Sequence, residues 1–163
     1  MKKWKDLVVT PIETVWKYNE WHEHDEKVGE LLGFALSIEQ RYVECFPERK
    51  LPLPYYFSME DNHLLADEYA SCALLTYDKK DAYLSKLCAY PMHQGHGKRF
   101  LEKVQNMLRS QKVERVWLFT DRGSHVGGFY EKLGYKMVNE KEGVPPSIWS
   151  IRYEDNLYCL VLC

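Results

Sequence analysis

The segment from Leu87 to Arg99 combines glycines, histidines and basic residues at the junction of two predicted elements. An apolar run ends at Tyr90, and a helical pattern follows Gly97. Glycine lets a backbone approach an anion closely, and the first amides of a helix lack internal partners and carry the positive end of its dipole. Such a junction can bind phosphate, with Lys98 and Arg99 adding charge. The alternative is an ordinary glycine-containing turn with solvated basic side chains.

Several other kinds of site are excluded by the motifs they require. The pattern GxxxxGK[ST] is absent, and the loop does not follow the first strand as a dinucleotide-binding turn would. The five cysteines form no CxxC pair, so we expect neither a redox motif nor a metal site, and we expect reduced thiols. The pair His22 and His24 lies in a charge-rich run, which predicts a solvated face.

The bulk composition predicts one globular domain over residues 1–163. The chain is 45% hydrophobic and 28% charged, with a formal net charge of −2, which gives no basic surface for nucleic acid. No apolar stretch approaches the ~20 residues that span a bilayer, and no secretory signal is visible. We therefore expect a cytoplasmic protein that binds neither nucleic acid nor membranes.

The elements around the junction follow from hydrophobic periodicity. Residues 26–46 predict a helix, and residues 55–59, 69–77 and 82–90 predict three antiparallel strands joined by polar turns. The helix after Gly97 should bury Phe100, Leu101, Val104 and Leu108. Residues 113–121 predict a strand that is apolar on both faces, as parallel strands are. Together these elements form a βαβ unit.

The remaining elements complete a mixed sheet. Residues 124–133 predict a helix with a stripe of Val126, Phe129, Tyr130 and Leu133, ended by Gly134 in a left-handed conformation. Residues 135–138 form a strand, residues 140–146 a polar loop, and residues 157–163 a terminal strand paired with the one before. The fold class is α/β, with an α+β-like mixed sheet and helices on its faces.

Two stretches in this order resemble the signatures of the GNAT superfamily of N-acetyltransferases. Residues 91–97 (PMHQGHG) are similar to the loop that holds the CoA diphosphate, and residues 129–135 (FYEKLGY) to the second signature. The resemblance covers roughly residue 16 to the C-terminus. It implies the GNAT acyl-CoA N-acyltransferase fold, with a mostly antiparallel central sheet, a splayed parallel pair of fourth and fifth strands, and flanking helices.

The loop departs from the family pattern Q/R-x-x-G-x-G/A in either of two registers. Counted from Pro91, Gln94 takes the Gln/Arg position, and Arg99 falls where Gly or Ala is usual. Counted from the helix, Gly95 and Gly97 take the glycine positions. We prefer the second register, because the helical periodicity supports it.

The resemblance implies direct transfer of acetyl from acetyl-CoA to a primary amine of a small molecule or peptide. It assigns cofactor contacts to Leu87, Cys88, Ala89, Gln94, Gly95, His96, Gly97, Lys98, Arg99, Asp121, Phe129 and Tyr130. Tyr130 also takes the position of the acid that protonates the departing CoA sulfur. The alternative is an acyl-CoA-binding sensor without catalysis, which the irregular loop and Gly123 in place of a usual Asn favour.

No acid on the predicted fourth strand identifies a general base. Ser85 is a candidate proton relay through water, and Glu44, Asp67, Glu68 and Asp121 are other carboxylates that could reach a cleft. The candidate acceptor-binding residues are Trp16, Glu20, Trp21 and Tyr83. Family members are often dimers, so the terminal strand is a candidate edge for a homodimer.

Overall fold

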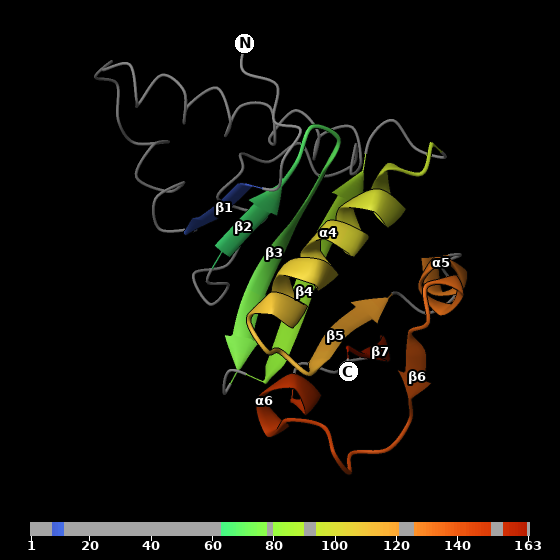
Figure 1. Ribbon diagram of the computed structural model, residues 1–163. Coiled ribbons are helices and arrows are strands. Elements are labelled where there is room, and N and C mark those ends of the chain that lie inside the picture. The colour runs from blue at the N-terminus through green and yellow to red at the C-terminus, as the bar shows by residue number, and fades with distance from the viewer. Residues whose placement is uncertain are drawn as a thin grey trace, which may run out of the picture. The chain divides into compact units, whose positions relative to one another are not determined.

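The computed structural model describes residues 8–11, 63–77, 80–89, 94–120, 126–150 and 155–162. They belong to two compact units, one formed by Met1–Leu75 and Lys86–Val104 and the other by Thr76–Ser85 and Gln105–Cys163. Strands β3 and β4 and helix α4 contribute to both, and the strand order is β1-β2-β3-β4-β5-β7-β6 (Figure 1). The predictions for residues 26–46 and 55–59 lie outside the described residues.

The first unit contains an antiparallel series of strands: β1 (Val8–Pro11), β2 (His63–Ala66) and β3 (Ala70–Tyr77). The chain reverses between β2 and β3 because Asp67 Oδ1 accepts the amides of Tyr69 and Ala70, each at 2.9 Å. Strand β1 ends at Pro11. The end of β4 (Asp81–Ala89) and the start of α4 (His96–Ser110) complete the unit.

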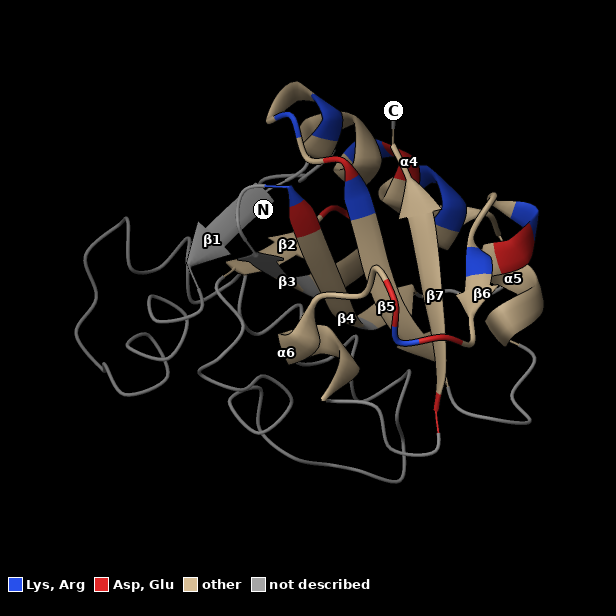
Figure 2. Ribbon diagram, turned by 90° about the horizontal axis from the view of Figure 1, so that it is seen from below, with Lys and Arg blue, Asp and Glu red and all other residues tan. Residues whose placement is uncertain are grey.

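The second unit contains the predicted parallel pair. The start of β4 pairs with β5 (Arg115–Thr120) in parallel, and the oppositely charged Asp81 and Arg115 are the first partners (Figure 2). The ladder ends at Tyr83 and Trp117 after three residue pairs, although both strands continue. The sheet is therefore mixed, with a parallel pair that separates early, as predicted.

Strand β7 (Asn156–Val161) is antiparallel to β5 along all six of its residues and also pairs with β6 (Lys136–Val138). Because β7 has a neighbour on each side, the expectation that the terminal strand offers a free edge for a homodimer is wrong. The short strand β6 ends the strand order instead.

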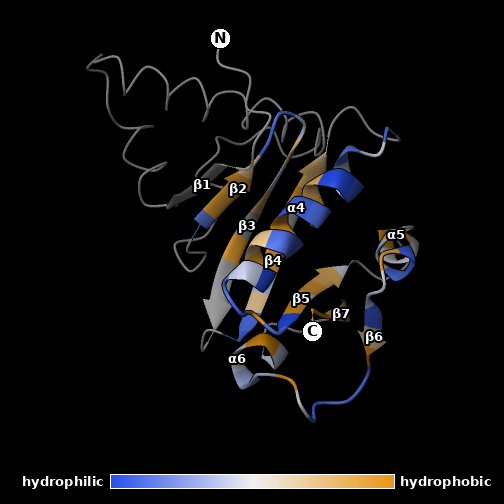
Figure 3. Ribbon diagram, viewed as in Figure 1, coloured by the Kyte–Doolittle hydropathy of each residue, from blue (hydrophilic) through white to orange (hydrophobic). Residues whose placement is uncertain are grey.

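Helix α4 has the amphipathic pattern that its sequence predicts (Figure 3). Phe100, Leu101, Val104 and Leu108 are at most 1% exposed. The helix ends where Lys112 adopts a φ of 63°, and the amide of Val113 donates to the Leu108 carbonyl at 3.0 Å. This reversal directs the chain into β5.

Two short helices follow β5. Helix α5 (Val126–Lys132) lies in the predicted range, and Gly134 has the expected positive φ, +96°. Val126 is 47% exposed, so its assignment to the buried stripe is wrong. Helix α6 (Pro146–Trp149) lies directly after the predicted loop, and its Ile148 packs in an apolar cluster with Trp117, Val144 and Leu157.

Candidate functional site

The segment predicted to bind phosphate lies at the amino-terminal end of α4. Gly95 has a φ of +77°, which residues with a Cβ rarely adopt, and α4 begins at the next residue, His96. The Arg99 amide donates to the Gly95 carbonyl at 3.1 Å, so the amides of residues 96–98 precede the first helical bond. No acidic side chain occupies the first turn. An anion bound at the positive end of the helix would therefore not be repelled by a carboxylate of that turn.

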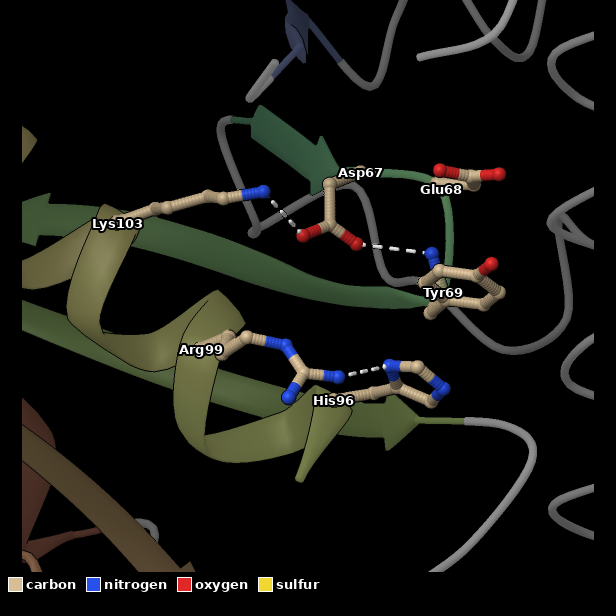
Figure 4. A pocket seen from close by; sticks show the side chains of 6 residues that line it. All are labelled: Asp67, Glu68, Tyr69, His96, Arg99 and Lys103. Atoms are coloured by element: carbon tan, nitrogen blue, oxygen red, sulfur yellow. Dashed lines mark hydrogen bonds and ion pairs between the residues drawn. The ribbon is translucent and has the colours of Figure 1, made fainter. Parts of the chain in front are cut away.

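Arg99 folds its side chain back over this turn. Its Nη2 donates to the Gln94 carbonyl oxygen at 3.1 Å and lies 2.6 Å from His96 Nδ1 (Figure 4). Its Nη1 is close to Gly95, since a Cβ added there would lie 3.1 Å away. The guanidinium charge is thus held at the glycine turn. Lys98 is exposed.

A pocket of about 230 Å³ lies beside the first turns of α4. Its walls come from the β2–β3 turn and from α4, and its lining residues are Asp67, Glu68, Tyr69, His96, Arg99 and Lys103 (Figure 4). The rings of Tyr69 and His96 are stacked, with centroids 3.9 Å apart. Lys103 Nζ donates to Asp67 Oδ2 at 2.9 Å.

These contacts give Asp67 a structural role. Its Oδ1 holds the turn amides, its Oδ2 holds Lys103, and the residue is 5% exposed. A carboxylate with both oxygens engaged is a poor candidate for a general base. Sequence reasoning assigned no site role to Tyr69 or Lys103. The spacing of Arg99 and Lys103, four residues apart on one helix face, is the signal that could have found Lys103.

Tyr130 lies in an aromatic cluster of the second unit and is 6% exposed. Its ring centroid is 5.1 Å from that of Phe129, 5.4 Å from that of Tyr135 and 6.5 Å from that of Tyr158. Its carbonyl accepts the amides of Leu133 and Tyr135 at 3.0 and 3.1 Å. Backbone and ring contacts therefore both hold Tyr130 in place.

The two neighbouring tyrosines have hydroxyl partners on different elements. The Tyr135 hydroxyl accepts from Gln105 Nε2 of α4 at 3.0 Å, and the Tyr158 hydroxyl donates to Glu131 Oε1 of α5 at 3.2 Å. Burial raises the pKa of the Tyr158 phenol, and its hydrogen bond to Glu131 and the charge of that residue raise it further. The Tyr158 phenol therefore keeps its proton at neutral pH and acts as a donor.

Comparison with solved structures identifies the architecture. An acetyltransferase from Streptococcus agalactiae is 20% identical, with a TM-score of 0.59, and the match covers 95% of this chain and 98% of that one. Tetrahymena GCN5 is 12% identical, with a TM-score of 0.65 and coverage of 97% and 96%. An aminoglycoside 6'-N-acetyltransferase complexed with coenzyme A is 14% identical, with a TM-score of 0.58 and coverage of 96% and 97%.

The chain has the GNAT fold. No protein-family model matches the sequence, and the comparison with curated proteins finds no relative. At identities of 12–20%, these structures show the fold of the chain. Within the described ranges, no helix is both long and apolar enough to cross a membrane.

The predicted pantetheine contacts of the GNAT-fold chain lie at the end of β4. Leu87 and Ala89 are half-buried, and Cys88 is 2% exposed. Cys88 is disulfide-bonded, whereas Cys72 and Cys159 form no disulfide. The prediction of reduced thiols is therefore wrong for Cys88. An apolar run such as that around Cys88 suits a buried thiol and a buried disulfide equally well.

The other predicted site residues fall in different places. Ser85 and Phe129 are half-buried, and Tyr83 packs edge-on against Phe119 at 6.0 Å, beside the apolar cluster of the second unit. Within the part of the chain that the structure describes, no group of three His, Cys, Asp or Glu side chains could hold a metal ion. The candidates that lie outside the described residues are Trp16, Glu20, Trp21, Glu44 and Asp121.

Proposed function

We propose that this protein is an N-acetyltransferase that transfers the acetyl group of acetyl-CoA to a primary amine of a small molecule or a peptide. The supporting observation is the first turn of α4 in a chain with the GNAT fold. Gly95 has a positive φ, the first turn of α4 carries no acidic side chain, and the guanidinium of Arg99 lies over the turn. These features fit a diphosphate, which needs amide donors and positive charge.

The roles follow from the chemistry of each group. The amides of residues 95–98 and the side chains of Gln94, Lys98 and Arg99 bind the diphosphate. The backbone of residues 87–89, at the end of β4, is the proposed contact of the pantetheine arm, as the resemblance to the GNAT family implies.

Tyr130 is the proposed general acid. The amine nitrogen forms a bond to the thioester carbon, the carbon–sulfur bond breaks, and the Tyr130 phenol gives its proton to the departing sulfur. The amine must first lose its own proton. For an amine with a pKa near 10.4 this costs about 4.6 kcal/mol at pH 7, and for an α-amine about 1 kcal/mol. Ser85 is the proposed relay, which passes this proton through water to the solvent. The nitrogen loses a second proton once it is acylated, and that proton restores the Tyr130 phenol.

The acceptor contacts, the homodimer and the cellular location are further predictions for this protein. Trp16, Glu20, Trp21 and Tyr83 stay the predicted contacts of the acceptor, and the homodimer stays a prediction. The cytoplasmic location also stays a prediction.

Two measurements test the proposal. Acetyl-CoA at 100 times its Kd should raise the free energy of unfolding by about 2.7 kcal/mol, seen as a higher melting temperature. Release of free CoA thiol should then depend on an amine, tested with a polyamine, an aminoglycoside and a peptide with a free α-amine. No thermal shift would refute both binding and transfer. A shift without thiol release from any amine would favour the sensor instead.

A further inference from the structure

Helix α5, which carries Tyr130, has a sequence that does not hold a helix by itself. It has seven residues, and Gly127 and Gly128 lie in its first turn. Isolated helices this short are marginal in water, and glycine disfavours the helical conformation. The direction of the Tyr130 side chain therefore depends on contacts that α5 makes with other elements.

Tyr158 of β7 makes two such contacts with one hydroxyl. The hydroxyl donates to Glu131 Oε1 at 3.2 Å, and a Cβ added to Gly127 would lie only 2.6 Å from it. Gly127 and Glu131 are four residues apart and so share one face of α5. Only glycine fits at the first of these positions without moving the phenol. The contact therefore spans a full turn of the helix.

Tyr158 is held in place by its own strand, β7. Strand β7 is paired on both sides, and Tyr158 is 2% exposed. Its ring also reaches that of Tyr130, with centroids 6.5 Å apart. A buried ring on an inner strand has little freedom to follow a moving helix, so it determines where the helix lies.

We propose that Tyr158 is a positioning residue, whose hydroxyl fixes α5 against β7 and so sets the direction of the Tyr130 phenol. This inference rests on the proposed function, in which Tyr130 protonates the CoA sulfur. The raised pKa of Tyr158 agrees with it, because the hydroxyl must keep its proton to donate to Glu131.

Tyr158→Phe removes only the hydroxyl, and Tyr135→Phe is its matched control. Both rings contact that of Tyr130, but the Tyr135 hydroxyl bonds to Gln105 of α4. With acetyl-CoA and the best amine of the panel, Tyr158→Phe should lower kcat about tenfold and change the KM for acetyl-CoA less than about twofold, because misplacing a reacting group costs rate rather than binding. Tyr135→Phe should change kcat less than about twofold. Equal loss in both variants would overturn the inference.

Two further results separate positioning from general stability. Glu131→Gln, which keeps an acceptor, should preserve kcat, whereas Glu131→Ala should repeat the loss. In a Tyr130→Phe background, Tyr158→Phe should lower kcat no further, because it acts through Tyr130. A loss of the same size in both backgrounds would overturn the inference.

A measurement independent of turnover keeps the inference separate from the proposed function. The carbon-13 ring signals of Tyr130, assigned by their loss in Tyr130→Phe, should shift or broaden in Tyr158→Phe and keep their positions far better in Glu131→Gln. Unchanged signals in Tyr158→Phe would overturn the positioning role. Changed signals in a protein that transfers no acetyl group would support positioning while refuting the proposed function.

Discussion

Asp81 and Arg115 face each other at the start of the parallel strands β4 and β5, with Arg115 Nε 2.8 Å from Asp81 Oδ1. A second bond joins Nη2 to Oδ2 at 3.2 Å, and Trp117 Nε1 donates to Oδ1 at 2.9 Å. Nη1 reaches the Gly143 carbonyl at 2.8 Å. The Asp81 carboxylate thus fastens the start of the strand pair, where the described residues form their ladder. Its partner Arg115 also holds the loop before α6.

Asp81→Asn should destabilise the protein, because it removes the charge that both Arg115 and Trp117 face. Because Asp81 is 6% exposed, water cannot replace all the hydrogen bonds that its partners would lose. We expect the free energy of unfolding to fall by about 2 kcal/mol in urea titrations. Glu114→Gln makes the same charge change at an exposed residue and should stay within about 0.5 kcal/mol of the wild type. If both variants lost the same free energy of unfolding, the change in net charge would explain the loss, and these contacts would not.

Gly95→Ala should weaken acetyl-CoA binding as well as stability. The backbone at φ +77° strains any residue with a Cβ, and the new methyl would crowd Arg99 Nη1 at 3.1 Å. Gly143→Ala is the matched control, since its φ is +80° and nothing lies within 4 Å of the added Cβ. Both variants should lose about 1 kcal/mol of stability. Only Gly95→Ala should raise the Kd for acetyl-CoA in calorimetry, and a similar Kd in both would argue against a diphosphate site at this turn.

Sequence periodicity predicted most elements of the described part of the chain, because their apolar patterns are long and regular. The buried stripe of α4 and the two-sided apolar run of β5 are the clearest cases. Strand β2 was missed because His63–Ala66 is a four-residue segment without alternation, which suits a strand or a helix equally. Helix α6 was missed because it has only four residues, and its two adjacent apolar side chains show no helical period.

The sequence predicted which types of residue form the candidate site, but it did not predict how their side chains are arranged. The glycines and basic residues of residues 94–99 indicated an anion site from sequence. That Arg99 bends back onto Gln94 and His96 depends on side-chain rotamers, which periodicity does not encode. The contact of Tyr158 with Gly127 joins residues that are 31 positions apart in the sequence. Only the register of β7 brings them together.

Tyr130→Phe should slow the chemical step and leave cofactor binding nearly intact. A general acid contributes typically about 10² to 10⁴ in rate, so kcat should fall at least tenfold to a hundredfold, whereas the Kd for acetyl-CoA should change less than about twofold. Single-turnover kinetics and calorimetry measure the two separately. Tyr135→Phe, at a neighbouring ring that also contacts Tyr130, should change kcat less than about twofold. If Tyr130→Phe weakened acetyl-CoA binding as much as it lowered kcat, Tyr130 would not be the general acid.

The thiol of Cys159 should react slowly at neutral pH and faster in alkali. Burial raises the pKa of this thiol from 9.0 to about 11, and Asp81 also raises it, while Arg115 acts in the opposite direction. Because the thiolate is the nucleophile, alkylation of Cys159 by iodoacetamide should increase roughly tenfold per pH unit up to pH 11. Mass spectrometry of the Cys159 peptide measures this rate, and a plateau near pH 9 would contradict the raised pKa.

The same shift links Cys159 to stability in a definite direction. The unfolded chain loses this proton near pH 9, whereas the folded chain keeps it to about pH 11. Unfolding therefore releases a proton between these values, and the free energy of unfolding should fall as pH rises through this window. Cys159→Ser removes the titrating group, so its stability should decline less between pH 9 and 11 than that of the wild type. Parallel curves for the two proteins would show that other groups cause the alkaline loss.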